Sequence, residues 1–108
     1  MTECIVCKIA NREIPTDFVA ESLHAVAFRD RSPMQAVHVL VVPKEHFTDV
    51  ADLASKNEEI LIDLMKLGTL VASQQSTGSF RFQFNTGSEA GQTVFHAHGH
   101  ITSTTPKN

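Results

Sequence analysis

The stretch that decides the fold is His96-Ala97-His98-Gly99-His100, in which histidine occupies every second position. In a β-strand, side chains at i, i+2 and i+4 project from one face about 6–7 Å apart, whereas on a helix they would fan apart. Phe95 and Ile101 flank the histidines and support a strand. We therefore predict a last strand over residues 94–102 that presents three imidazoles on the same side.

Three kinds of site could use this histidine cluster. A surface strand could carry it without a function, a metal could bind the alternating imidazoles, or a neutral imidazole could attack phosphorus while its neighbours donate hydrogen bonds to phosphoryl oxygens. The preceding segment, residues 87–93, is a polar loop with two glycines. Its backbone N–H groups and the Thr93 hydroxyl could cradle an anion, which favours phosphorus chemistry.

Composition limits the other function classes. The 108 residues fit a single domain, 1–108, and 9 basic against 12 acidic residues give a net charge of −3, which argues against a basic nucleic-acid-binding surface. The longest apolar run, residues 39–42, is far shorter than the roughly 20 residues of a membrane helix. The N-terminus has neither a basic flank nor an apolar signal core. We expect a cytoplasmic protein with no nucleic-acid or membrane partner.

The remaining pattern predicts a mixed set of elements. We expect a short helix near residues 5–10, a hairpin of residues 19–21 and 24–29, a strand over 38–42 that is covered on both faces, and a strand over 80–85. A capping box from Ser55 to Glu58 predicts the start of a long helix. The apolar positions of that helix extend well beyond one stripe, so we expect it to pack on its own sheet and on a second subunit.

Several segments together resemble the histidine triad (HIT) family. Residues 91–101 resemble its signature, His-x-His-x-His followed by apolar residues. Weaker matches fall in the family's order, at residues 4–9, 14–15, 27–33, 38–46 and 85–87. The chain looks like the Hint branch, the small nucleoside phosphoramidases. The resemblance implies an α+β HIT-like fold with an antiparallel sheet of about five strands, one long helix and a short N-terminal helix, and a homodimer through the 58–75 helix.

The resemblance also implies an activity. The chain would hydrolyse purine nucleoside 5′-phosphoramidates, or related nucleotidyl conjugates, through a nucleotidyl-histidine intermediate, with no cofactor required for catalysis. His98 would attack the α-phosphorus, and His100 and Thr93 would bind the phosphate oxygens. His96 and His38 would orient the nucleophile. The implied nucleotide-binding residues are Asp30, Arg31, Asn85, Gly91, Gln92, Thr93, Ile5, Val6, Ile9, Ile14 and Phe28.

Cys4 and Cys7 form a Cys-x-x-Cys pair, and two cysteines are too few for a disulfide scaffold. The pair could be two reduced thiols in a short helix, or half of a tetrahedral zinc site. As in some bacterial members of the resembled family, His46 and His96 would complete a structural zinc site.

The same residues are compatible with other functions. One is a nucleotide-binding regulatory module with little turnover, and another is a dinucleoside polyphosphate hydrolase. A metalloenzyme that uses the triad as a catalytic metal site would need the nucleophile itself as a ligand. The chain departs from the family pattern at several positions: Gly99 replaces a larger apolar residue, Thr102 weakens the apolar pair after the triad, Arg31 stands at a ribose-side position that is usually aliphatic, and Val6 is smaller than the aromatic often found in the base pocket.

Overall fold

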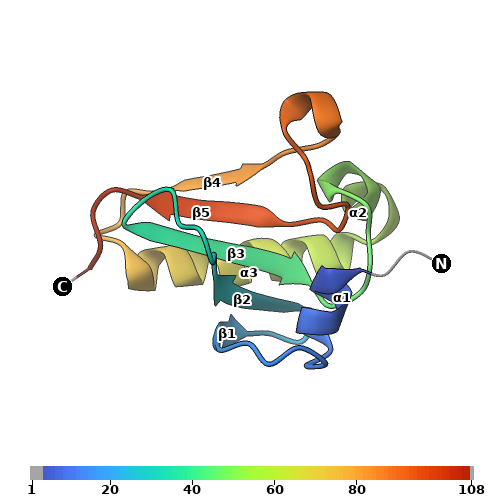
Figure 1. Cartoon of the computed structure of the whole chain (residues 1–108), viewed down its shortest axis with the longest axis horizontal. Coiled ribbons are helices and arrows are strands. Elements are labelled where there is room, and N and C mark those ends of the chain that lie inside the picture. The colour runs from blue at the N-terminus through green and yellow to red at the C-terminus, as the bar shows by residue number, and fades with distance from the viewer. Residues whose placement is uncertain (1–3, 108) are drawn as a thin grey trace.

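The computed structural model describes residues 4–107 and shows an α+β fold in which helices cover both faces of one antiparallel sheet (Figure 1). The five strands are arranged in the order β1-β2-β3-β5-β4. They are β1 (Phe18–Glu21), β2 (Ala25–Arg29), β3 (Val37–Pro43), β4 (Arg81–Phe84) and β5 (Gly99–Ser103). The helices are α1 (Ile5–Ala10), α2 (Val50–Lys56) and α3 (Glu58–Gln75), with a short 3-10 turn, η1 (Ser88–Ala90). The expected fold class, the short N-terminal helix and the hairpin are confirmed.

The central strand β3 shows that the sheet is buried on both faces. Its residues alternate between two hydrophobic clusters, as the twofold period of a strand requires. Val39 and Val41 pack in the cluster that includes α3, whereas Val42 packs with Val6 and Phe28 in the cluster beneath α1. The continuous apolar run is therefore the sequence of a strand buried on both faces, as predicted.

Helix α3 buries one face against the sheet and leaves a second apolar face exposed. Ile60, Leu64 and Val71 are among its buried residues, whereas Ile62 and Leu70 are each 53% exposed. The described residues contain no helix that is long and apolar enough to cross a membrane.

The predicted capping box at the start of α3 is wrong. Ser55 lies inside α2, and the N-cap of α3 is Asn57, whose side chain accepts a hydrogen bond of 3.0 Å from the Ile60 amide. Asn57 is extended, with φ −151°, so it separates two helices that the sequence pattern merges.

The last strand is shorter than predicted, because β5 starts at Gly99 rather than at residue 94. Gly99 is the first residue of β5, and it pairs with Val41 on one side and Phe84 on the other. The residues before Gly99 lie outside the strand ladder, and the Ala97 amide donates instead to the Phe47 carbonyl at 2.7 Å. His96 and His98 therefore lie outside the strand, so the expectation that a strand would hold three imidazoles on one face is wrong.

Gly99 has a packing role that accounts for its departure from the family pattern. A Cβ atom at Gly99 would lie 2.3 Å from Cε1 of Phe82, and one at Gly68 would lie 2.3 Å from Cε2 of the same ring. The Phe82 ring thus occupies the space between α3 and β5. An aromatic ring from the neighbouring strand fills the volume that a larger residue at position 99 would take.

Candidate active site

A cavity of about 350 Å³ lies where α1, the ends of β2 and β3, and the segment before β5 converge. Two of the three triad histidines, His98 and His100, line it together with Thr93. The other predicted residues in its walls are Ile5, Val6, Ile9, Phe28, Asp30 and Arg31. We call this the triad cavity.

Five further residues line the triad cavity and were not predicted: Thr16, Arg29, Leu40, Val42 and Val94. Leu40 and Val42 could have been found, because they alternate along the strand and so share a face. For Thr16, Arg29 and Val94 the sequence holds no comparable signal.

Hydrogen bonding defines the tautomer of His98. Its Nδ1 lies 2.8 Å from the backbone carbonyl oxygen of His96. A carbonyl can only accept, so Nδ1 must carry the proton and donate. The lone pair of a neutral His98 is then on Nε2, the atom that a nucleophilic role requires.

A second chain of hydrogen bonds defines which ring nitrogen of His100 carries the proton. The Met34 amide donates to Nδ1 of His38 at 3.0 Å, so the proton of neutral His38 is on Nε2. That Nε2 lies 3.0 Å from Nδ1 of His100 and 3.4 Å from Oδ2 of Asp30. Nδ1 of His100 accepts from His38, which leaves His100 with an N–H donor at Nε2.

Burial lowers the pKa of His100, and the nearby His98 and His38 lower it further. The imidazole therefore remains neutral at a pH where a free histidine would begin to gain a proton. His100 is suited to donate a hydrogen bond to a phosphoryl oxygen rather than to act as a cation.

Three of the predicted nucleotide-binding residues do not line the triad cavity. Gln92 is buried, and its side chain accepts from the Gly87 amide at 2.8 Å and donates to the carbonyls of Thr48 and Val94. Gly91 has φ 95°, a left-handed conformation that glycine adopts without strain. Asn85 accepts a hydrogen bond from Gln83. Gln92 and Gly91 thus shape the loop that presents Thr93.

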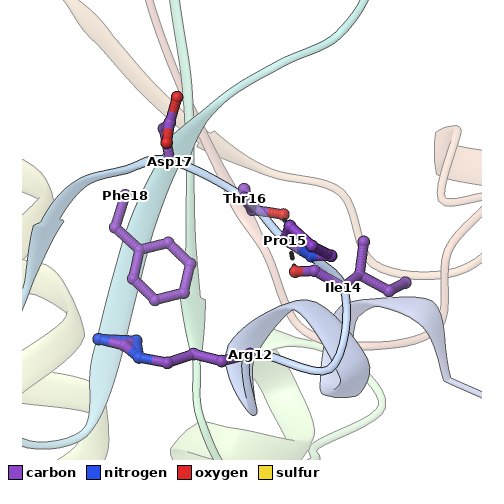
Figure 2. Close-up of a pocket in the computed structure, with 6 residues that line it drawn as sticks. All are labelled: Arg12, Ile14, Pro15, Thr16, Asp17 and Phe18. Atoms are coloured by element: carbon purple, nitrogen blue, oxygen red, sulfur yellow. Dashed lines mark hydrogen bonds between the residues drawn. The ribbon is translucent and has the colours of Figure 1, made fainter.

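Ile14 is the fourth predicted residue outside the triad cavity. It lies with Arg12, Thr16 and Phe18 in a separate cavity of about 450 Å³, which Figure 2 shows. Arg12 has φ 62°, and the chain turns there after the end of α1. This turn places Ile14 in the other cavity, although Thr16 lines both.

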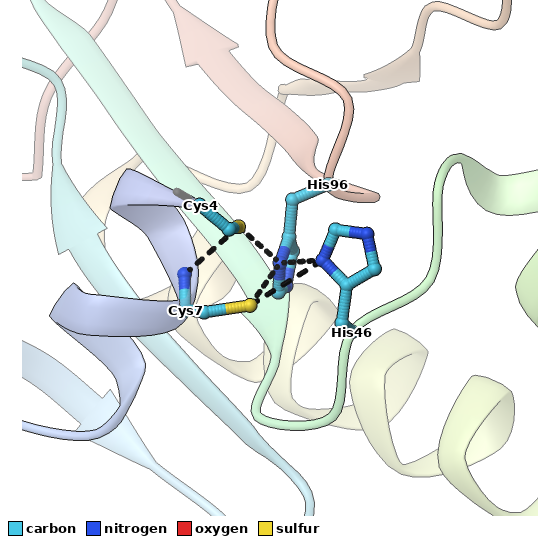
Figure 3. A group of neighbouring side chains, drawn as sticks. All are labelled: Cys4, Cys7, His46 and His96. Carbon is cyan, nitrogen blue, oxygen red and sulfur yellow. Dashed lines mark hydrogen bonds between the residues drawn. The ribbon is translucent and has the colours of Figure 1, made fainter. Parts of the chain in front are cut away.

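The third triad histidine, His96, belongs to a different cluster. Its Nδ1 lies 3.3 Å from Sγ of Cys4, 3.3 Å from Sγ of Cys7 and 3.2 Å from Nδ1 of His46 (Figure 3). The four candidate ligand atoms all lie within 4.8 Å of one another. Tetrahedral zinc with sulfur and nitrogen ligands needs donor atoms about 3.3–3.8 Å apart, so the Cys4–Cys7–His46–His96 cluster fits such an ion.

The electrostatics of the cluster agree with that fit. Nε2 of His96 donates to the Pro43 carbonyl at 2.9 Å, which leaves the lone pair on Nδ1, facing the cysteines. Burial lowers the pKa of His96 to about 4, so the imidazole is neutral, the form that binds metal. Burial and the neighbouring Cys4 raise the pKa of the Cys7 thiol to about 11. Without a cation the Cys7 sulfur would remain protonated.

Known proteins resemble this chain over almost its whole length. The family model described as "Scavenger mRNA decapping enzyme C-term binding" matches residues 3–108. Protein HitA of Neisseria gonorrhoeae is 39% identical over 105 residues, 96% of this chain and 98% of that protein. The purine nucleoside phosphoramidase of Escherichia coli K12 is 34% identical over 101 residues, 92% of this chain and 85% of that protein. The structure of a HIT family hydrolase from Clostridium thermocellum has a TM-score of 0.86 and 38% identity, covering 95% of this chain and 91% of that one.

Proposed function

The chain belongs to the histidine triad (HIT) family of hydrolases and nucleotide-binding proteins, and on this basis we propose that it hydrolyses purine nucleoside 5′-phosphoramidates. The observation that carries the proposal is the triad cavity, whose walls combine the apolar side chains of Val6, Ile9 and Phe28 with the polar groups of His98, His100 and Thr93. Such a cavity matches a nucleotide, whose flat base presents two apolar faces and whose phosphate needs hydrogen-bond donors.

Each part of the substrate has a counterpart in the walls. The base lies among Val6, Ile9 and Phe28, and Ile5 lies at its edge. Asp30 accepts hydrogen bonds from the ribose hydroxyls. Its Oδ1 already accepts from the Ser32 amide at 2.8 Å, a contact that fixes the orientation of the carboxylate. The Thr93 hydroxyl and the Nε2–H group of His100 donate to the phosphate oxygens.

The reaction proceeds in two displacements at phosphorus. Nε2 of His98 attacks the α-phosphorus, a P–N bond to the imidazole forms, and the P–N bond to the amine breaks as the leaving nitrogen takes a proton from the solvent and departs as the amine. A water molecule then attacks the nucleotidyl-imidazole, a P–O bond forms, and the P–N bond to the imidazole breaks while the water gives one proton to the solvent, which balances the proton taken by the amine. The net reaction converts the phosphoramidate and water into a nucleoside monophosphate and an amine.

We further propose that Cys4, Cys7, His46 and His96 bind a structural zinc ion. All four positions are protein ligands, the arrangement of a closed structural site. When bound, the ion supplies cross-linking energy between α1, the segment after β3 and the residues before β5, and no catalytic step. His98 is not a ligand, so its nucleophilic nitrogen stays available.

The exposed face of α3 supports a homodimer. Ile62 and Leu70 are each 53% exposed, and Met65 is 37% exposed, along one helix. Soluble monomers rarely leave a contiguous apolar surface of this kind in water. A twofold axis through α3 would cover it with its own copy.

Hydrolysis of defined nucleotides tests the proposed activity. The protein is incubated with adenosine 5′-phosphoramidate and, separately, with a diadenosine polyphosphate, each with and without a chelator. We expect AMP and ammonia from the first substrate, at a higher kcat/KM than for the second. Faster cleavage of the dinucleotide would favour a dinucleoside polyphosphate hydrolase, and tight AMP binding without turnover would favour a regulatory module. Loss of turnover with chelator, in protein that stays folded, would point to a catalytic metal.

A further inference from the structure

A second cavity, of about 520 Å³, adjoins the triad cavity and serves none of the roles described so far. The two cavities share three wall residues, Ile5, Thr93 and Val94. Thr93 is one of the residues proposed above to bind the phosphate oxygens. The second cavity thus begins where the phosphorus atom of a bound nucleotide would lie.

The walls of this second cavity combine three apolar side chains with four polar ones: Ile5, Val94 and Phe95 with Cys4, His46, Thr48 and Thr93. Phe95 is 49% exposed and Val94 is 38% exposed, so both offer apolar surface to a ligand. Cys4 and His46 also contribute, but Cys4 Sγ and His46 Nδ1 are directed toward the Cys4–Cys7–His46–His96 cluster (Figure 3). Among the described residues, no Asp, Glu, Lys or Arg lines this cavity. The exposed Val94 and Phe95 side chains therefore give part of this cavity a surface that fits a neutral apolar group.

We propose that the second cavity binds the leaving group of the substrate and selects amines with an aromatic or other apolar substituent. The inference rests on the proposed function, because only a phosphorus-bound substituent would enter the cavity at Thr93. The nucleoside fills the triad cavity, and the remaining substituent on phosphorus extends past Thr93 and Val94 toward Phe95. The amine leaves with a proton when its P–N bond breaks, as in the first displacement, so the contact with Phe95 adds recognition but no chemical step.

Two substrates that differ only in the size of the amine substituent test this proposal. N-methyl and N-(2-phenylethyl) adenosine 5′-phosphoramidates release primary alkylamines of similar basicity, so their P–N bonds have comparable reactivity. We expect a higher kcat/KM for the phenylethyl substrate, by between about twofold and tenfold, the range that one aromatic contact provides. Equal values for the two substrates would overturn the leaving-group proposal while leaving the proposed function intact. Hydrolysis of neither substrate would overturn the proposed function itself, and this inference with it.

Two variants locate the contact. Phe95→Ala removes the aromatic wall, and Thr48→Trp fills the cavity from a side chain that is exposed and outside the triad cavity. Both should reduce the ratio of the two kcat/KM values toward one. Both should also retain the wild-type Kd for AMP, which has no leaving group. Phe80→Ala, at an aromatic residue 37% exposed beside β4, is the matched control and should leave the ratio unchanged. A ratio that persists in both cavity variants would place the discrimination elsewhere and refute the proposal.

Discussion

Nδ1 of His98 donates a hydrogen bond to the backbone carbonyl oxygen of His96, 2.8 Å away, so the main chain of one triad histidine orients the side chain of another. The side chain of His96 is itself fixed between Cys4, Cys7 and the Pro43 carbonyl. The orientation of the proposed nucleophile therefore depends on a cluster that lies outside the triad cavity.

Substitution of the nucleophile should abolish turnover with little effect on binding. We expect His98→Ala to lower kcat by roughly 1,000-fold or more, because a covalent route loses its attacking atom. AMP affinity, measured by calorimetry, should change by only a few fold. His24→Ala is the control, at a histidine between β1 and β2 and outside the triad cavity. Near-normal turnover in His98→Ala would show that another group attacks phosphorus.

The Cys4–Cys7–His46–His96 cluster should bind metal stoichiometrically. Protein purified without chelator should contain about one zinc per chain, and a strong chelator should lower its Tm, because metal-binding energy contributes to folding. Cys7→Ser should bind less zinc and show a smaller chelator effect. Elemental analysis that finds no zinc, together with two freely titratable thiols, would exclude the site.

The low pKa of His100 predicts a pH dependence of stability. In the unfolded chain this imidazole gains a proton near pH 6.5, whereas burial in the folded state delays protonation to lower pH. The folded state thus binds fewer protons in that interval, so the free energy of unfolding falls as the pH drops below about 6.5.

The difference between the wild type and His100→Asn isolates this effect, because zinc release at low pH occurs in both proteins. Thermal unfolding should show that Tm falls more steeply with acid in the wild type than in the variant. Parallel Tm profiles between pH 7 and pH 4 would contradict the assignment.

The exposed face of α3 should determine the oligomeric state. We expect a dimer at micromolar concentration in sedimentation experiments, and a monomer for Leu70→Glu, because a buried unpaired charge opposes association. Leu23→Glu is the matched control, since Leu23 is 76% exposed in the turn before β2. A wild type that sediments as a stable monomer would rule out this interface.

The close approach of Gly99 and Phe82 predicts a destabilising substitution. Gly99→Ala places a Cβ atom 2.3 Å from the Phe82 ring and should reduce the free energy of unfolding by about 1–3 kcal/mol. Adding Phe82→Leu should recover part of the loss, because the smaller side chain relieves the closer contact, whereas the contact of 2.8 Å with the Phe84 ring remains. Additive losses in the double variant, measured by urea unfolding, would show that the two residues are not coupled.

The sequence predicts most of this fold because strand alternation reports burial directly. The run of residues 38–42 indicates a strand that is buried on both faces, and the structure places Val41 toward α3 and Val42 toward α1. The start of α3 is harder, because Ser55 and Asn57 are both good N-cap residues and only tertiary structure separates α2 from α3.

The site is less predictable, because a periodic pattern does not show where pairing stops. The alternation of histidines continues through His96, but the ladder ends at Gly99 and the chain turns away. The Met34 amide that fixes the proton of His38 is a backbone group, so its role cannot be read from a side-chain pattern.

Helix α1 has only six residues, too few to be stable by itself, yet it contributes to both the Cys4–Cys7–His46–His96 cluster and the triad cavity. Cys7 extends from it toward His46 and His96, while Val6 and Ile9 line the triad cavity. A cation in the cluster and a purine in the cavity would each favour the same docked position of α1. Thermodynamic reciprocity then requires that each ligand raise the affinity of the other by an equal factor, so that metal supply would tune nucleotide affinity through one short helix.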